Sequence, residues 1–215
     1  MHTEAVKASN PAYERLLQDY VDYHLALVVV GGFFTLALLA FGVSSWVRFR
    51  RAPRGVERRT HLVFGLASSV VGLLLAVVVA ANLSNVLNPR QGLAGAIGTP
   101  RNLKAAASGE LTQSLTAWVR SGSAEVPRLI QSHVAARLAW QEPKAVISAL
   151  LLVMFVAVSV VVWRSVIVRS RAGNRVLGRV LAGSVSLLAS FLLILMVMGN
   201  TQASYAPITM TLLFG

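Results

Sequence analysis

The sequence contains no cysteine, and only 13% of its residues are charged. Without cysteine the chain can form no disulfide, no thiolate metal site and no cysteine nucleophile. The charged fraction is about half of that in a typical soluble domain, while 55% of the residues are hydrophobic and the mean hydropathy is +0.65. These values exclude an ordinary water-soluble domain and predict an integral membrane protein.

Acidic residues and lysine are also scarce. Eight Asp and Glu residues stand against 20 Lys and Arg residues, which gives a net charge of +12, and Lys7, Lys104 and Lys144 are the only lysines. This arginine-rich composition, with its many Ala, Val, Leu and Gly residues, is typical of a GC-rich bacterial genome. In a soluble protein the positive charge would favour nucleic-acid binding. Here the arginines flank apolar runs, so we predict no nucleic-acid partner.

Four uncharged apolar runs are each about as long as a membrane is thick. They cover residues 25–47, 62–82, 145–163 and 180–199. A helix of about 20 residues crosses roughly 30 Å of hydrocarbon, and backbone groups in lipid must be hydrogen-bonded within the segment. The sequence therefore predicts an all-α membrane protein with four transmembrane helices in two hairpins, residues 25–83 and 145–204.

The loops inside these two hairpins are rich in arginine. Residues 48–61 and 164–179 contain one acid, Glu57, and eleven arginines: Arg48, Arg50, Arg51, Arg54, Arg58, Arg59, Arg164, Arg169, Arg171, Arg175 and Arg179. Short loops with excess positive charge stay on the cytoplasmic side of a membrane. Both termini and residues 84–144 are then extracytoplasmic, and the predicted location is a bacterial inner membrane. Anionic lipid headgroups are the expected partners of the arginines.

Residues 84–144 are predicted to form a short helical subdomain between spans two and three. The glycine- and proline-rich residues 89–100 should be irregular. Two short amphipathic helices are expected over residues 99–122 and 123–143, the second ending at Pro143 where span three begins. Their apolar faces have three candidate partners, namely the outer membrane interface, the helix bundle or another protein.

The two ends of the chain carry further signals. In residues 1–24, Asn10 is suited to cap a helix and Pro11 to open it, and this helix should run into span one. Residues 205–215 are uncharged and contain the helix-breaking Pro207. Because this tail is too short to recross the bilayer, we predict that it packs against a neighbouring chain.

A shift of 118 residues aligns the second hairpin with the first. The matching residues include five pairs: Gly65 and Gly183, Ser68 and Ser186, Asn82 and Asn200, Pro89 and Pro207, and, in the two loops, Arg51 and Arg169. Two hairpins in the same orientation would form a parallel repeat, an arrangement that occurs in transporters. The alternative is that unrelated membrane helices end alike in Asn and Pro at the interface.

No pattern typical of an enzyme is present. The histidines at 2, 24, 61 and 133 lack metal-ligand spacing, and the glycines near residue 95 lack the context of a phosphate-binding loop. No ionisable side chain lies in the four apolar runs, where such groups would mark ion pathways. We predict no catalytic, metal-binding or cofactor-binding residues. Small residues at helical spacing are predicted to pack helices together: Gly65, Ser69, Ala182, Ser186 and Ser190.

These observations favour a non-enzymatic accessory or scaffold subunit of a larger membrane assembly. Its partners would be other integral membrane subunits or copies of itself. It would dock through the extracytoplasmic helices and the tail, using large apolar side chains: Trp118, Trp140, Leu129, Ile130, Met210, Leu213 and Phe214. The alternative is a small channel or carrier, built from the two parallel hairpins and assembled as a homo-oligomer.

Overall fold

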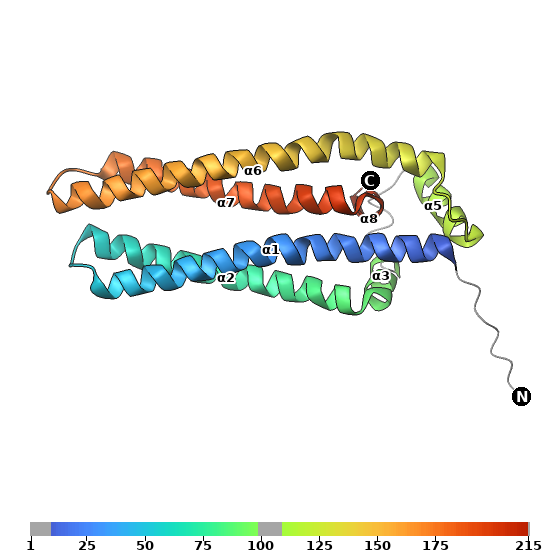
Figure 1. The fold of residues 1–215 in the computed structure, drawn as a ribbon, viewed down its shortest axis with the longest axis horizontal. Coiled ribbons are helices and arrows are strands. Elements are labelled where there is room, and N and C mark those ends of the chain that lie inside the picture. Colours follow the sequence, from blue (N-terminus) through green and yellow to red (C-terminus); the bar gives the residue numbers. More distant parts are fainter. Residues whose placement is uncertain (1–9, 99–108, 215) are drawn as a thin grey trace, which may run out of the picture. The chain divides into compact units, whose positions relative to one another are not determined.

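Every element of the described chain is an α-helix (Figure 1). The computed structural model describes residues 10–98 and 109–214, without the side chains of residues 96–98, 112 and 212–214. The helices are α1 (Pro11–Arg51), α2 (Val56–Leu87), α3 (Pro89–Gly98), α5 (Gly109–Ser121), α6 (Arg128–Arg171), α7 (Leu177–Tyr205) and α8 (Pro207–Phe214). Helices α1, α2, α6 and α7 are long and apolar enough to cross a membrane, which confirms the predicted all-α chain with four candidate spans.

Helix α1 begins at the predicted cap. The Oδ1 atom of Asn10 accepts a hydrogen bond from the N–H of Tyr13 at 2.9 Å, and the Asn10 carbonyl accepts one from the N–H of Glu14 at 3.0 Å. Pro11 occupies the first helical position, where its missing N–H costs nothing. These local interactions explain why polar residues ahead of the first apolar run are already helical.

Residues 89–98 form helix α3, so the prediction of an irregular stretch is wrong there. Pro89 is the first residue of the helix, and the N–H of Gly92 donates to the carbonyl of Asn88 at 3.1 Å. A proline in this position starts a helix instead of ending it. The glycines lower helix propensity, but Leu93, only 2% exposed, fixes the helix by tertiary packing.

Helix α6 is continuous over 44 residues, so the prediction of a separate short helix over residues 123–143 is wrong. Pro143 lies inside α6, where a proline removes one backbone hydrogen bond and costs about 3 kcal/mol. Pro143 is exposed, and the hydrogen bonds on either side of it persist. The other expected short helix is α5, which starts at Gly109; residues 99–108 of its expected range lie outside the described residues.

The loops that join α1 to α2 and α6 to α7 both turn at a glycine. Gly55 has a φ of 129° and Gly173 a φ of 74°. Residues with a side chain rarely adopt positive φ, so these two positions favour glycine. Gly55 lies four residues after the arginine-rich end of α1 and Gly173 two residues after that of α6, and the chain reverses in each loop.

The chain divides into two units, and we describe each by itself. The first contains residues 1–26, 83–142 and 202–215, and the second contains residues 27–82 and 143–201. The first unit has an apolar core with contributions from α1, α3, α5, α6 and α8: Ala12, Leu16, Leu17, Tyr20, Leu93, Leu111, Leu115, Trp118, Ile130 and Ile208. In the second unit most large apolar side chains are exposed, such as Leu36 at 71% and Val153 at 70%. Such a surface is compatible with lipid and not with water.

Part of the C-terminal tail packs on its own chain, and the expected contact with a neighbouring chain stays a prediction. Residues 207–214 form α8, in which Ile208 is 7% exposed and belongs to the core of the first unit. Thr209 is also buried, and Met210 is half-buried. Within α8, Ile208 is therefore covered by the chain itself and Met210 is partly covered, whereas Tyr205 before it is 70% exposed.

Candidate functional site

Three of the seven residues predicted to dock a partner lie in or against the core of the first unit. Trp118 is 2% exposed, and its indole N–H donates to the carbonyl of Ser123 at 3.0 Å. Ile130 is 1% exposed, and Leu129 packs against the same core. The exposed face of α5 is polar instead, as at Glu110 and Arg120. The apolar face of α5 is therefore used inside the chain and leaves no large apolar surface for a partner.

Trp140 is placed differently, because its side chain is 69% exposed. It lies on α6, five residues before the apolar run that begins at Ala145. Of the remaining predicted docking residues, Met210 is half-buried, and the side chains of Leu213 and Phe214 lie outside the described residues. Trp140 is thus the most accessible described side chain of the predicted docking set.

Helix α8 is attached to α1 by hydrogen bonds as well as by apolar packing. The carboxylate of Asp19 accepts hydrogen bonds from the backbone N–H groups of Thr209, at 2.6 Å, and Ile208, at 3.4 Å. These are among the N–H groups that a helix leaves unpaired at its N-terminus. The side chain of Gln202 also donates to the carbonyl of Tyr23 at 3.2 Å. Asp19 therefore caps α8 from another helix.

The electrostatics around Asp19 reflect a partly dehydrated surrounding. Burial raises the pKa of Asp19 above its ordinary value and outweighs the hydrogen bonds from α8, which act in the opposite direction. Burial also raises the pKa of Tyr20 and of Tyr23. His24 contacts both tyrosine rings edge to face, with centroids 4.4 and 5.0 Å away. No three His, Cys, Asp or Glu side chains gather into a metal-binding group within the described residues.

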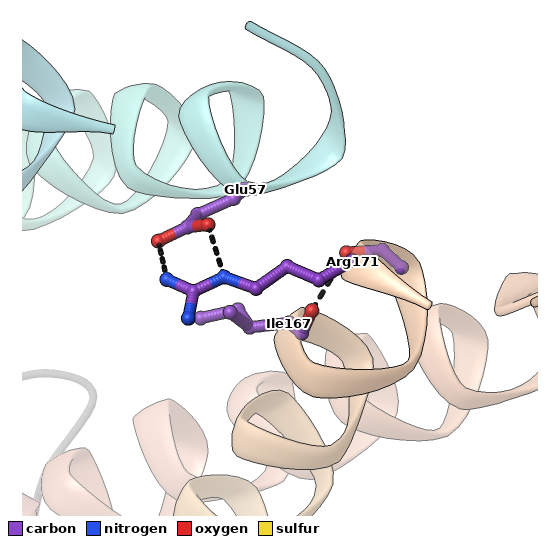
Figure 2. A network of polar contacts seen from close by, with 4 residues as sticks. Glu57, Ile167 and Arg171 are labelled. Atoms are coloured by element: carbon purple, nitrogen blue, oxygen red, sulfur yellow. Dashed lines mark hydrogen bonds and ion pairs between the residues drawn. The ribbon is translucent and has the colours of Figure 1, made fainter. Parts of the chain in front are cut away.

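In the second unit, the two arginine-rich loops are joined by an ion pair (Figure 2). Arg171, at the end of α6, donates from Nε to one carboxylate oxygen of Glu57 at 2.7 Å and from Nη2 to the other at 2.6 Å. The Glu57 side chain is 11% exposed and the Arg171 side chain 61% exposed. The hydrogen bonds from Arg171 lower the pKa of Glu57, while burial lowers the pKa of His61 one turn further along α2.

The other ten arginines of the two loops form no ion pair within the described part of the chain. None of them is buried, and the guanidinium of Arg58 lies over the ring of Phe49 with its carbon 4.8 Å from the centroid. This end of the second unit therefore carries a large uncompensated positive charge.

Two tryptophans lie against glycines: Trp46 against Gly65, which was predicted to pack helices, and Trp163 against Gly183, its match in the internal repeat. A Cβ atom added at Gly65 would lie 3.1 Å from the ring of Trp46 on α1, and one added at Gly183 would lie 2.8 Å from the ring of Trp163 on α6. The indole N–H of Trp46 also donates to Ser69 at 3.2 Å. In both helix pairs a glycine thus provides the space for an indole ring.

Ser186 on α7 makes a polar contact with α6. The hydroxyl of Ser159 donates to that of Ser186 at 2.8 Å, which donates to the carbonyl of Phe155 at 3.0 Å. Ser190 donates to the carbonyl of Ser186 at 2.9 Å. Ala182, predicted to join this interface, is exposed, because it lies one position away from the buried Gly183.

Local structure repeats at the spacing of 118 residues that the sequence suggests. The glycines with positive φ, Gly55 and Gly173, are 118 residues apart. Asn82 and Asn200 each donate to the backbone carbonyl four residues earlier, at 2.8 and 2.7 Å. Pro89 and Pro207 are each the first residue of a short helix after a long one. The order of two long helices and one short helix therefore occurs twice, in α1–α3 and in α6–α8.

Comparison of the chain with family models, with curated proteins and with solved structures found no match. Three features were not predicted from the sequence. They are the capping of α8 by Asp19, the pairing of Glu57 with Arg171, and the packing of two tryptophan rings against glycines. Of these, only the tryptophans had a sequence signal, since Trp46 and Trp163 lie at nearly the same distance before their glycines.

Proposed function

We propose that this chain is a four-span protein of a bacterial inner membrane, arranged as two transmembrane hairpins with an extracytoplasmic helical subdomain. Both termini are extracytoplasmic, and the two arginine-rich loops are cytoplasmic. The Glu57–Arg171 ion pair supports this arrangement, since it joins both loops at one end of the second unit. Reporter fusions after residue 215 and near residue 54 test it: the two must give opposite signals, and a cytoplasmic C-terminus would contradict the topology.

Within that arrangement, we propose a non-enzymatic accessory or scaffold role in a larger membrane assembly. The observation that carries this proposal is Trp140, a large aromatic side chain that is 69% exposed on a helix held by the folded core of the first unit. Tryptophan is enriched among residues that dominate binding energy. Because Trp140 lies next to an apolar span, the partner that fits it best is another integral membrane subunit or a second copy of the chain.

Copurification in a mild detergent tests this role. Trp140→Ala should reduce recovery of a stoichiometric partner while the variant still inserts and folds. Tyr205→Ala is the matched control, because Tyr205 is an aromatic residue of similar exposure, 70%, at the end of α7. Unchanged recovery with Trp140→Ala would contradict docking at this residue. An equal loss in both variants would indicate that the aromatic side chains only anchor the protein at the membrane interface.

A second candidate is a small channel or carrier, and the internal repeat favours it. Parallel repeats related by an axis along the membrane normal occur in transporters, and the helix order of α1–α3 returns in α6–α8. Native mass spectrometry distinguishes the two candidates. A closed homo-oligomer without other chains supports a channel or carrier, whereas stoichiometric foreign subunits support the accessory role.

We also propose that anionic lipid headgroups bind the arginines at the cytoplasmic end. Each basic residue near an anionic surface contributes about 1 kcal/mol to such an interaction. The ten arginines outside the ion pair support this proposal. Lipid retained after purification should be enriched in anionic species, and replacing Arg50, Arg54 and Arg59 with Gln should reduce the enrichment. An unchanged lipid profile would contradict it.

A further inference from the structure

Glu57 and Arg171 connect the two halves of the internal repeat. Glu57 lies in the first turn of α2, and Arg171 is the last residue of α6. An acid at a helix N-terminus and a base at a helix C-terminus each interact favourably with their own helix dipole. The pair is bidentate, with distances of 2.6 and 2.7 Å, which is the geometry of a strong, directional ion pair.

Glu57 pairs specifically with Arg171 and not with another arginine of the second loop. Glu57 is the only acid in either loop, and five arginines of the second loop are available to it in the sequence. Arg169 lies in the same last turn of α6, yet Arg171 takes both carboxylate oxygens. The contact therefore depends on the position of α6 relative to α2 within the second unit, and not on charge alone.

Next to the ion pair, α2 and α6 carry a row of buried or contacting side chains, which we call the seam. The rings of Phe64 on α2 and Trp163 on α6 are in edge-on contact, with centroids 4.8 Å apart. Val166 is fully buried, and Thr60 and His61 are 8% and 7% exposed. On α2, Thr60, His61 and Phe64 follow Glu57 at spacings of three or four residues, and on α6 Trp163 lies eight residues, about two turns, before Arg171. The ion pair is thus the outermost contact of the seam.

The glycines at the loop tips lie next to the paired residues. Gly55 precedes Glu57 by two residues, and Gly173 follows Arg171 by two residues. Glycine gives the backbone more conformational freedom than any other residue. Beyond the ion pair, each loop can therefore change direction without disturbing the packed seam.

We propose that the Glu57–Arg171 ion pair is a clamp that holds the α1–α2 loop against the α6–α7 loop. With the clamp closed, the two repeats are fastened at their arginine-rich end. When it opens, the loops separate while the seam from Phe64 to Trp163 stays packed. This inference does not depend on which proposed function is right, because it concerns only contacts inside the second unit.

The absence of native cysteine allows a direct test. Spin labels at Arg54→Cys and Asn174→Cys, both exposed positions on the loops, report the distance between the loops by pulsed electron paramagnetic resonance in lipid nanodiscs. The labelled parent should show one narrow distance distribution. Glu57→Gln and Arg171→Gln should each shift the maximum to longer distances and broaden it. The matched control Arg169→Gln removes one positive charge from the same helix turn and should leave the distribution unchanged.

A charge swap makes the test decisive. The double variant Glu57→Arg with Arg171→Glu should return the distribution toward that of the parent, although the reversed charges now oppose both helix dipoles. The proposal is overturned if Glu57→Gln and Arg171→Gln keep the parent distribution. It is also overturned if Arg169→Gln has the same effect as Arg171→Gln, because the loops would then respond to net charge and not to the pair.

Discussion

Replacing Gly183 with alanine tests the close packing of α7 on α6. The added Cβ would lie 2.8 Å from Cε2 and Nε1 of Trp163 and 3.2 Å from Cγ1 of Val162, so the indole must move. The indole ring of Trp163 cannot move away without disturbing Phe64, because the centroids of the two rings are 4.8 Å apart. Overpacking of this kind typically costs about 1–3 kcal/mol, whereas alanine regains up to about 1 kcal/mol of helix propensity over glycine. A net destabilisation of about 1 kcal/mol follows.

Two glycines provide the matched comparisons. At Gly65 the nearest indole atom, on Trp46, would be 3.1 Å from the new Cβ, a contact that a shift of a few tenths of an ångström relieves. Gly65→Ala should therefore be nearly neutral. At Gly178 on α7 no atom lies within 4 Å of the new Cβ, so Gly178→Ala should stabilise the protein. The expected order of stability is Gly178→Ala, then Gly65→Ala, then Gly183→Ala.

Thermal unfolding in one detergent, followed by circular dichroism, measures the order. For a protein of this size, 1 kcal/mol shifts Tm by roughly 2–4 °C. Trp163→Phe should reduce the cost of Gly183→Ala, since it removes the atoms that clash, and Trp163 Nε1 has no hydrogen-bond partner among the described residues to lose. If Gly183→Ala is as stable as Gly178→Ala, or if Trp163→Phe leaves its cost unchanged, the described helix contact is wrong.

Three further predictions concern charge and core packing. Because the pKa of Glu57 is lowered, ionised Glu57 stabilises the folded state at pH values above the ordinary pKa of a glutamate, and this stabilisation is lost as the pH falls through the lowered pKa. The difference in Tm between the parent and Glu57→Gln should therefore vanish in acidic solution. A difference that persists there refutes the contribution of the ion pair. Because the pKa of Asp19 is raised, the folded state gains stability as the pH falls through that pKa. Asp19→Asn should abolish this gain in stability, and Asp22→Asn should retain it. The reverse result would contradict the assignment of the pH dependence to Asp19. Leu16 lies in the core of the first unit, and Leu16→Ala should lower the free energy of unfolding by about 2–5 kcal/mol. Leu36 is 71% exposed on a span, so Leu36→Ala should lower it far less. Equal losses of stability would contradict the described burial.

The sequence predicted the features that depend on short-range chemistry. The four apolar runs, the arginine-rich loops and the cap at Asn10 each follow from residues close together along the chain. Membrane-spanning helices are especially easy to predict from sequence, because a segment in lipid must be helical whatever the helix propensity of its residues. The offset of 118 residues was also visible, since Asn82 and Asn200, for example, each occur at the end of an apolar run.

The wrong predictions of helix bounds arose at prolines, which are compatible with more than one position relative to a helix. Pro89 and Pro143 are both helix breakers by propensity, yet Pro89 opens α3 and Pro143 lies inside α6. A proline can begin a helix without cost and can be retained within a long one when neighbouring hydrogen bonds hold the backbone. Position in the folded helix, and not residue type, decided the outcome in each case.

By itself the sequence determined which segments are apolar enough for lipid and which helix ends carry charge, because hydrophobicity and charge are properties of single residues. Only the tertiary structure decided which groups meet. It selected Arg171 for Glu57, brought Asp19 to the start of α8 from 189 residues away in the chain, and buried Trp118 while leaving Trp140 exposed. Such contacts depend on how whole helices pack against one another, and a pairing between distant residues leaves no periodic signal in either segment.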